Sequence, residues 1–74
     1  MFGERIRVLR TERGLTQEKL AGKSDLTTGF LNNVEHGRKT PSLTTILKLA
    51  RGLRVDASEL LAEFTFAALK KLKL

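Results

Sequence analysis

The sequence of 74 residues has no cysteine and a single histidine. The lack of cysteine excludes both a disulfide framework and a thiolate zinc site, so side-chain packing alone has to supply the core. The one histidine, His36, has no second histidine and no cysteine with which to bind a metal ion, and we expect neither a metal site nor a cofactor. At this length the chain forms one small core, which leaves no room for a separate catalytic domain.

Long apolar stretches are also absent. No run approaches the roughly 20 residues that a membrane span needs, and the first residues lack the charged and then apolar order of a signal peptide. We therefore expect a soluble, cytoplasmic protein that does not act on a membrane. The sequence shows no nucleophile with its base and no phosphate-binding glycine loop, so an enzyme is not expected.

Acidic residues are few relative to basic ones. Lysine and arginine together number 14 against 8 aspartate and glutamate, which gives a net charge of +6 and an isoelectric point near 10.4. Such an excess in a short chain favours a polyanionic partner, nucleic acid above all. Charge alone does not decide this, because many small domains are basic merely for solubility.

Strand patterns are nearly missing, since no alternating apolar run of useful length occurs before residue 63. Apolar residues recur three and four positions apart instead, which predicts an all-α protein. The first helix has Phe2, Ile6 and Leu9 on one face, and Gly14 is placed to end it in a left-handed conformation. The N-caps of four further helices are expected at Thr16, Thr27, Ser42 and Asp56.

The fourth and fifth helices follow from their apolar residues. The fourth follows the Pro41-Ser42 pair. Its expected core stripe is Leu43, Ile46, Leu47, Ala50 and Leu53. The fifth begins after Asp56 and is marked by Leu60, Leu61, Phe64 and Ala68. The sequence thus predicts five helices joined by short connections.

The segment between Gly14 and Pro41 has a distinctive order. Two short capped helices meet at a tight corner and are followed by Gly37 and a basic loop. This is the layout of a helix-turn-helix DNA reader. In that layout the second helix, from Thr28 to His36, lies in the major groove, and its outward side chains read the bases of double-stranded DNA.

Spacing turns Leu31 and Val34 of this second helix inward. The outer side is left to Thr28, Gly29, Asn32, Asn33 and His36. Two adjacent asparagines are poor helix formers, and base reading explains them better, because asparagine binds adenine N6 and N7 together. The base-reading set is therefore Thr28, Gly29, Asn32 and Asn33, with an ordinary solvated face as the alternative. We expect His36 to cap the end of the helix.

Phosphate contacts are expected beside this helix. The two helix starts at Thr16 and Thr27 present backbone N–H groups and the positive end of a helix dipole, although both threonines also serve simply as caps. Gln17 adds a side-chain donor, and the loop after Gly37 adds cations that position a protein without reading sequence. The full set is Thr16, Gln17, Thr27, Arg38, Lys39 and Thr40.

The chain resembles the Cro and phage-repressor type of helix-turn-helix, also called xenobiotic-response-element-like, from about Phe2 to Leu61. The resemblance rests on Ile6-Arg7-x-Leu9-Arg10, Gly14-Leu15-Thr16-Gln17-x-x-Leu20-Ala21, Val34-Glu35-x-Gly37-Arg38, Pro41-Ser42-Leu43 and Leu49-Ala50. It implies a compact five-helix, lambda-repressor-like bundle. It also implies that Ala21 lets the second and third helices cross closely, and that Arg10 and Glu35 form a partly buried ion pair.

The chain departs from that family in three ways. Asp25 stands at the turn where glycine is usual, and Arg54 replaces the usual glycine after the fourth helix while Gly52 lies inside that helix. A non-glycine residue tolerates the left-handed conformation less well, although aspartate does so better than most. Gly52 should cost about 1 kcal/mol relative to alanine in a helix interior. Gly29 leaves a contact position without a side chain, so we expect modest specificity per half-site and reliance on dimerisation.

The organisation that follows is a DNA-binding domain over residues 1–61 and an extension over residues 62–74. A single recognition helix reads few base pairs, so we expect a homodimer on a palindromic operator. The expected dimer contacts are Leu60, Phe64, Phe66 and Leu69. Packing of the extension on the last helices is an alternative, as is a short strand at residues 64–66. The alternative to a transcriptional regulator is a bundle that binds a protein partner, as an antitoxin does, with weak or no DNA binding.

Overall fold

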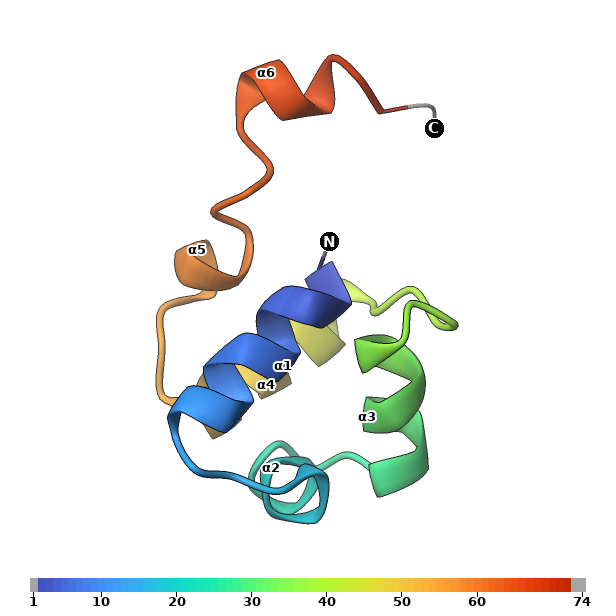
Figure 1. Cartoon of the computed structure of the whole chain (residues 1–74), viewed down its shortest axis with the longest axis vertical. Coiled ribbons are helices and arrows are strands. Elements are labelled where there is room, and N and C mark those ends of the chain that lie inside the picture. The colour runs from blue at the N-terminus through green and yellow to red at the C-terminus, as the bar shows by residue number, and fades with distance from the viewer. Residues whose placement is uncertain (1, 73–74) are drawn as a thin grey trace.

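The computed structural model describes residues 2–72, and within them the chain is helical with no strand. The helices are α1 (Phe2–Glu12), α2 (Gln17–Lys23), α3 (Thr28–Glu35), α4 (Leu43–Leu53), α5 (Ala57–Leu60) and α6 (Phe66–Leu69). Helices α1 to α5 form one bundle, and α6 stands apart from it beyond α5 (Figure 1). The all-α fold class is confirmed. None of these helices is long and apolar enough to cross a membrane.

The described residues contain six helices rather than the five that the sequence predicts. The expected fifth helix ends early, at Leu60, and a turn follows in which the Phe64 N–H donates to the Leu61 carbonyl at 2.9 Å. Thr65 then caps a new helix, because its hydroxyl accepts from the Ala68 N–H at 3.2 Å. This hydroxyl offers the backbone a fresh helix start, which explains why the apolar spacing alone misleads here.

Ten apolar side chains form the core. They are Ile6, Leu9, Leu20, Ala21, Leu31, Val34, Leu49, Ala50, Leu53 and Leu60. The stripe expected on α4 is partly wrong, because Leu43 and Leu47 are 67% and 51% exposed whereas Leu49 is fully buried. Apolar residues recur three and four positions apart both in the set 43, 46, 47, 50 and in the set 46, 49, 50, 53, so spacing within α4 allowed two overlapping faces, and only packing against α2, α1 and α5 selects between them.

The helix starts agree with the sequence. The hydroxyls of Thr16, Thr27 and Ser42 accept from the N–H groups three residues later, at 3.1, 3.1 and 3.2 Å. Asp56 occupies the N-cap position of α5, but its side chain makes no capping hydrogen bond. Three of the four expected caps therefore make their side-chain hydrogen bond, and each stabilises the start of its helix by about 1 kcal/mol.

Residues in the left-handed backbone conformation follow the ends of α1 to α4. Gly14 and Gly37 have φ of 66° and 74°, while two non-glycine residues, Asp25 and Arg54, adopt 55° and 60°. A residue with a Cβ loses about 1–2 kcal/mol in this conformation. The two departures from the family pattern therefore keep the backbone turns and carry a cost in stability.

Replacing Arg54 by glycine should raise the free energy of unfolding by about 0.5–1 kcal/mol, since the relieved strain exceeds the entropy that glycine adds to the unfolded chain. Urea unfolding followed by circular dichroism measures the change. Arg51→Gly is the matched control, because the same side chain is removed from a helical position of α4, and it should lose about 1 kcal/mol. Equal losses in both variants would contradict the assignment of strain to Arg54.

Candidate nucleic-acid interface

The helix-turn-helix consists of α2, the corner at Ser24–Thr27 and α3, and α3 lies along one side of the bundle (Figure 1). The inner face of α3 is fixed by Leu31 and Val34, which are 0% and 1% exposed. Thr28 and Gly29 are exposed on the opposite side, at the first turn. Asn32 and Asn33, one turn later, are each half-buried.

A buried ion pair joins α1 to the end of α3. The Arg10 guanidinium donates to both Glu35 oxygens, with Nε to Oε2 at 2.7 Å and Nη2 to Oε1 at 3.0 Å. The Arg10 and Glu35 side chains are only 13% and 1% exposed, and a third donor of Arg10 bonds the Leu15 carbonyl at 2.9 Å. The pair that the resemblance implies is thus present and ties α1 to the C-terminal end of α3.

Gln17 connects this pair to the outer side of α3. Its Nε2 donates to Glu35 Oε1 at 3.1 Å, and its Oε1 accepts from Asn32 Nδ2 at 3.3 Å. Asn32 Oδ1 in turn accepts from Arg38 Nη1 at 3.3 Å, and the same Nη1 lies 3.5 Å from Asn33 Oδ1. No pattern in the sequence indicated this chain of hydrogen bonds, because it joins residues that meet only where α2 crosses α3.

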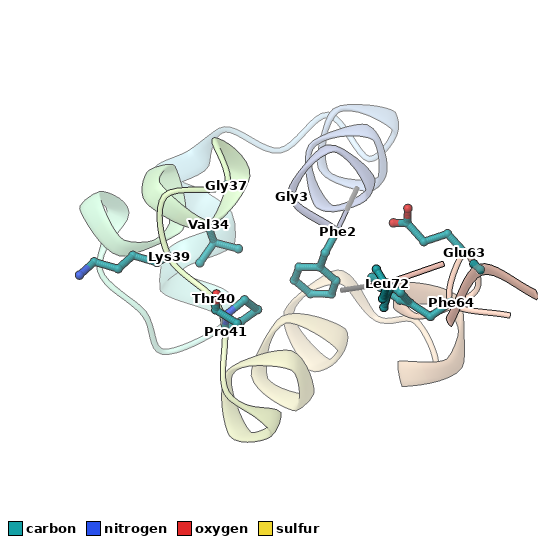
Figure 2. Close-up of a pocket in the computed structure, with 11 residues that line it drawn as sticks. Phe2, Gly3, Val34, Gly37, Lys39, Thr40, Pro41, Glu63, Phe64 and Leu72 are labelled. Atoms are coloured by element: carbon teal, nitrogen blue, oxygen red, sulfur yellow. The ribbon is translucent and has the colours of Figure 1, made fainter. Parts of the chain in front are cut away.

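The loop after α3 presents the expected cations. Arg38, Lys39 and Thr40 are all exposed, and the Arg38 N–H closes the helix by donating to the Asn33 carbonyl at 2.8 Å. Lys39 extends outward, away from the neighbouring hollow (Figure 2). The side chains of Thr16 and Thr27 are used as caps, as described above. This loop therefore places the Arg38 guanidinium beside the outer side of α3 and exposes Lys39 at the next position.

His36 is the C-cap of α3. Its Nδ1 lies 2.8 Å from the Asn32 carbonyl oxygen. A carbonyl oxygen only accepts, so Nδ1 carries the proton and donates in this contact. The expected capping role of His36 agrees with this contact. Within residues 2–72 no three histidine, aspartate or glutamate side chains gather in a way that could hold a metal ion.

An apolar hollow adjoins the loop after α3. This hollow of about 440 Å³ lies between the start of α1, the loop after α3 and the C-terminal extension. Figure 2 shows Phe2 between Pro41 on one side and Phe64 and Leu72 on the other. The extension also exposes Phe66, which is 78% accessible to solvent.

The four expected dimer contacts are placed differently from one another. Leu60 is fully buried in the core, so the expectation that it faces a partner is wrong for this conformation. Leu60 lies on α5, which packs against α4 and α1, so the bundle core itself covers this side chain. Phe64 is half-buried at the hollow, whereas Phe66 and Leu69 are exposed on α6.

Comparisons with known proteins agree with this geometry. The sequence profile described as Helix-turn-helix matches residues 6–60. The immunity repressor protein of Bacillus phage phi105 is 40% identical over 63 residues, which cover 85% of this chain but only 44% of the repressor. The control protein C.BamHI of Bacillus amyloliquefaciens is 35% identical over 66 residues, which cover 88% of this chain and 80% of that protein.

Solved structures give the same result. The restriction-modification controller protein C.AhdI from Aeromonas hydrophila has a TM-score of 0.79 and 47% identity, and the match covers 80% of this chain and 89% of that one. The wild-type controller C.Esp1396I has a TM-score of 0.77 at 25% identity, over 96% of this chain and 91% of its own. The chain belongs to the Cro and phage-repressor type of the helix-turn-helix family, whose members are DNA-binding transcriptional regulators.

Proposed function

We propose that the protein regulates transcription in the cytoplasm by binding a palindromic operator as a homodimer, with α3 of each protomer in the major groove. The observation that carries this proposal is the outer side of α3. It presents small and amide side chains, it is followed by a loop with two exposed cations, and a buried ion pair ties its C-terminal end to α1. The major groove is wide enough to admit an α-helix, and α3 is held in place by the bundle with this side free to enter it.

The first turn of α3 supplies the closest approach to the bases. Thr28 and Gly29 are exposed there, and residues at the start of a recognition helix are those that contact base edges. Thr28 offers a hydroxyl to a base or a methyl group to thymine, while Gly29 lets the backbone come near. The amides of Asn32 and Asn33 lie one turn further along. This short reading set accounts for the reliance on two half-sites.

Phosphate contacts are assigned to the residues on either side of this helix. They are Thr16, Gln17, Thr27, Arg38, Lys39 and Thr40. Of these, Arg38 and Lys39 carry the positive charge, and a protein that neutralises phosphates in this way releases counterions. The result is affinity that falls steeply with salt and that carries little sequence information.

Dimerisation is assigned to the apolar surface that the bundle leaves exposed. On the extension this surface consists of Phe64, Phe66 and Leu69, with Leu60 excluded because it is buried. Exposed apolar side chains of this size usually mark an interface. A dimer brings two recognition helices to half-sites about one turn, roughly 34 Å, apart.

Selection of bound sequences from random duplex DNA tests the proposal. The full chain should enrich one palindromic sequence, and its affinity for that sequence should fall linearly in log–log form with salt. No enrichment, together with no binding at low salt, would overturn the proposal and favour the alternative of a protein-binding bundle.

Lys39→Ala should weaken binding to every DNA sequence alike. We expect the slope of log affinity against log salt to fall by about 1 for each phosphate that the variant no longer neutralises, with the same preferred sequence retained. Fluorescence anisotropy with labelled operator and scrambled duplexes over a series of salt concentrations measures both. Arg51→Ala is the charge-matched control, because Arg51 lies on α4 at a distance from the recognition helix, and its slope should stay closer to the wild-type value. A change of preferred bases in Lys39→Ala would contradict the assignment.

A further inference from the structure

We propose that the two neighbouring asparagines have different roles, a conclusion that rests on the proposed function. Asn33 reads a base, whereas Asn32 is a positioning residue. It is one link in a chain of hydrogen bonds that begins at the buried Glu35, passes through Gln17 and ends at Arg38. This assignment differs from the expectation that both amides read bases in the same way.

The chemistry at the two ends fixes the direction of the whole chain. A carboxylate only accepts hydrogen bonds, so Gln17 has to turn its Nε2 toward Glu35, at 3.1 Å. Its Oε1 then faces Asn32, which has to donate through Nδ2, at 3.3 Å. The Oδ1 of Asn32 is left to accept from Arg38, which only donates, at 3.3 Å. Reversing either amide would oppose two acceptors or two donors.

This direction leaves the two asparagines unequally available. The Nδ2 and the Oδ1 of Asn32 are both engaged, so pairing with adenine N6 and N7 would require both hydrogen bonds to break. Asn33 has only the long 3.5 Å contact from Arg38 to its Oδ1, and its Nδ2 makes no hydrogen bond within residues 2–72. Asn33 is therefore the amide that is ready to bind a base edge.

The chain of hydrogen bonds is rigid at its Glu35 end. Glu35 is 1% exposed, and its Oε1 accepts from Arg10 at 3.0 Å as well as from Gln17. Hydrogen bonds to a buried carboxylate are charge-assisted, and little water reaches them that could replace either partner. Gln17 and Asn32 are consequently ordered before DNA arrives, which lowers the entropy lost on binding.

At its other end, the chain of hydrogen bonds orients Arg38. Its Nη1 is drawn to the amide oxygens of Asn32 and Asn33, so the guanidinium lies beside the reading side of α3 rather than free in solvent. Arg38 has five N–H donors, and the remaining ones are left to face DNA. Asn32 therefore contributes to binding through the placement of Arg38, without reading a base itself.

Sequence selection with the full chain separates the two roles. Asn33→Ala should relax the preference by about tenfold at one symmetric pair of operator positions. Asn32→Ala should keep the preferred bases at every position and lower the affinity for all sequences by a common factor. Relaxation by Asn32→Ala at a position of its own would overturn the inference while leaving the proposed function intact. A wild-type protein that enriches no sequence would overturn both.

A double-mutant cycle tests the chain itself. Gln17→Ala and Asn32→Ala interrupt the same series of hydrogen bonds. The double variant should therefore lose little more operator affinity than the single variant that binds the operator less tightly. Gln17→Ala with Lys39→Ala is the control pair, and its losses should multiply. Multiplicative losses in both pairs would overturn the inference.

A spectroscopic measurement on the free protein removes the dependence on DNA. Side-chain amide NMR of the full chain should show that Gln17→Ala shifts the Asn32 Nδ2 resonances and leaves those of Asn33 Nδ2 much closer to their wild-type positions. Unfolding midpoints close to the wild-type value identify variants that remain folded. If Asn32→Ala fails to fold, Gln17→Ala tests the same series of hydrogen bonds, because it removes the partner on the other side of Asn32. Unchanged Asn32 resonances in Gln17→Ala would overturn the inference.

Discussion

Glu35→Ala should lower the free energy of unfolding by about 3–5 kcal/mol, as expected when one partner of a buried ion pair is removed. The Arg10 side chain, which is only 13% exposed beside Glu35, would keep the Leu15 carbonyl as its one remaining hydrogen-bond partner among residues 2–72, and the Gln17 Nε2 would lose its acceptor. Urea unfolding at several temperatures measures the loss. A protein of this size has little stability to spare, so partial unfolding in the absence of urea is consistent with the same prediction.

Three variants separate burial of charge from loss of packing. Glu18→Ala removes an exposed acid from α2 and should change stability by less than about 0.5 kcal/mol. Arg10→Lys keeps the charge but cannot make the two-pronged contact, so it should fall between wild type and Glu35→Ala. The double change Arg10→Met with Glu35→Leu removes both charges and should be less harmful than Glu35→Ala alone. A loss below about 1 kcal/mol in Glu35→Ala would mean that the pair behaves as an exposed one.

The sequence predicts the parts of this structure that depend on neighbouring residues. Thr16, Thr27 and Ser42 cap helices because a hydroxyl needs only the N–H three residues later, and Gly14 and Gly37 adopt positive φ because the local turn requires it. The outward placement of Thr28 and Gly29 follows from the 3.6-residue period in the same way. Local chemistry was sufficient for each of these features.

Features that depend on contacts between helices were less accessible. Leu43 and Leu49 are equally apolar, and only the packing of α1, α2 and α5 on α4 decides that Leu49 is the buried one. The hydrogen bonds from Gln17 to Asn32 and Glu35 span 15 and 18 residues, so no spacing rule within one helix could indicate them. Arg10 and Glu35 were paired through family resemblance alone. The site was thus predictable as a surface, but not as a network.

Gly52→Ala should lower the free energy of unfolding by about 1–3 kcal/mol, as overpacking does, although alanine is the better helix former. A Cβ at this position would overlap Ser24 Oγ and lie 3.2 Å from Leu20 Cδ1, where α4 crosses the end of α2. The glycine inside α4 is therefore explained by close helix packing. Gly22→Ala is the matched control, because a Cβ there meets no atom within 4 Å, and it should gain up to about 1 kcal/mol.

Ser24 provides the decisive test of this explanation. Its Oγ is buried and has no hydrogen-bond partner among residues 2–72, so Ser24→Ala alone should be close to neutral or stabilising. The same change removes the atom that a Cβ at Gly52 would overlap. The Gly52→Ala loss should consequently shrink by at least about 1 kcal/mol in the Ser24→Ala background, a non-additivity that urea unfolding of the four proteins would reveal. Additive effects would mean that the two helices do not meet at these residues, since only a shared contact can make one substitution relieve the other.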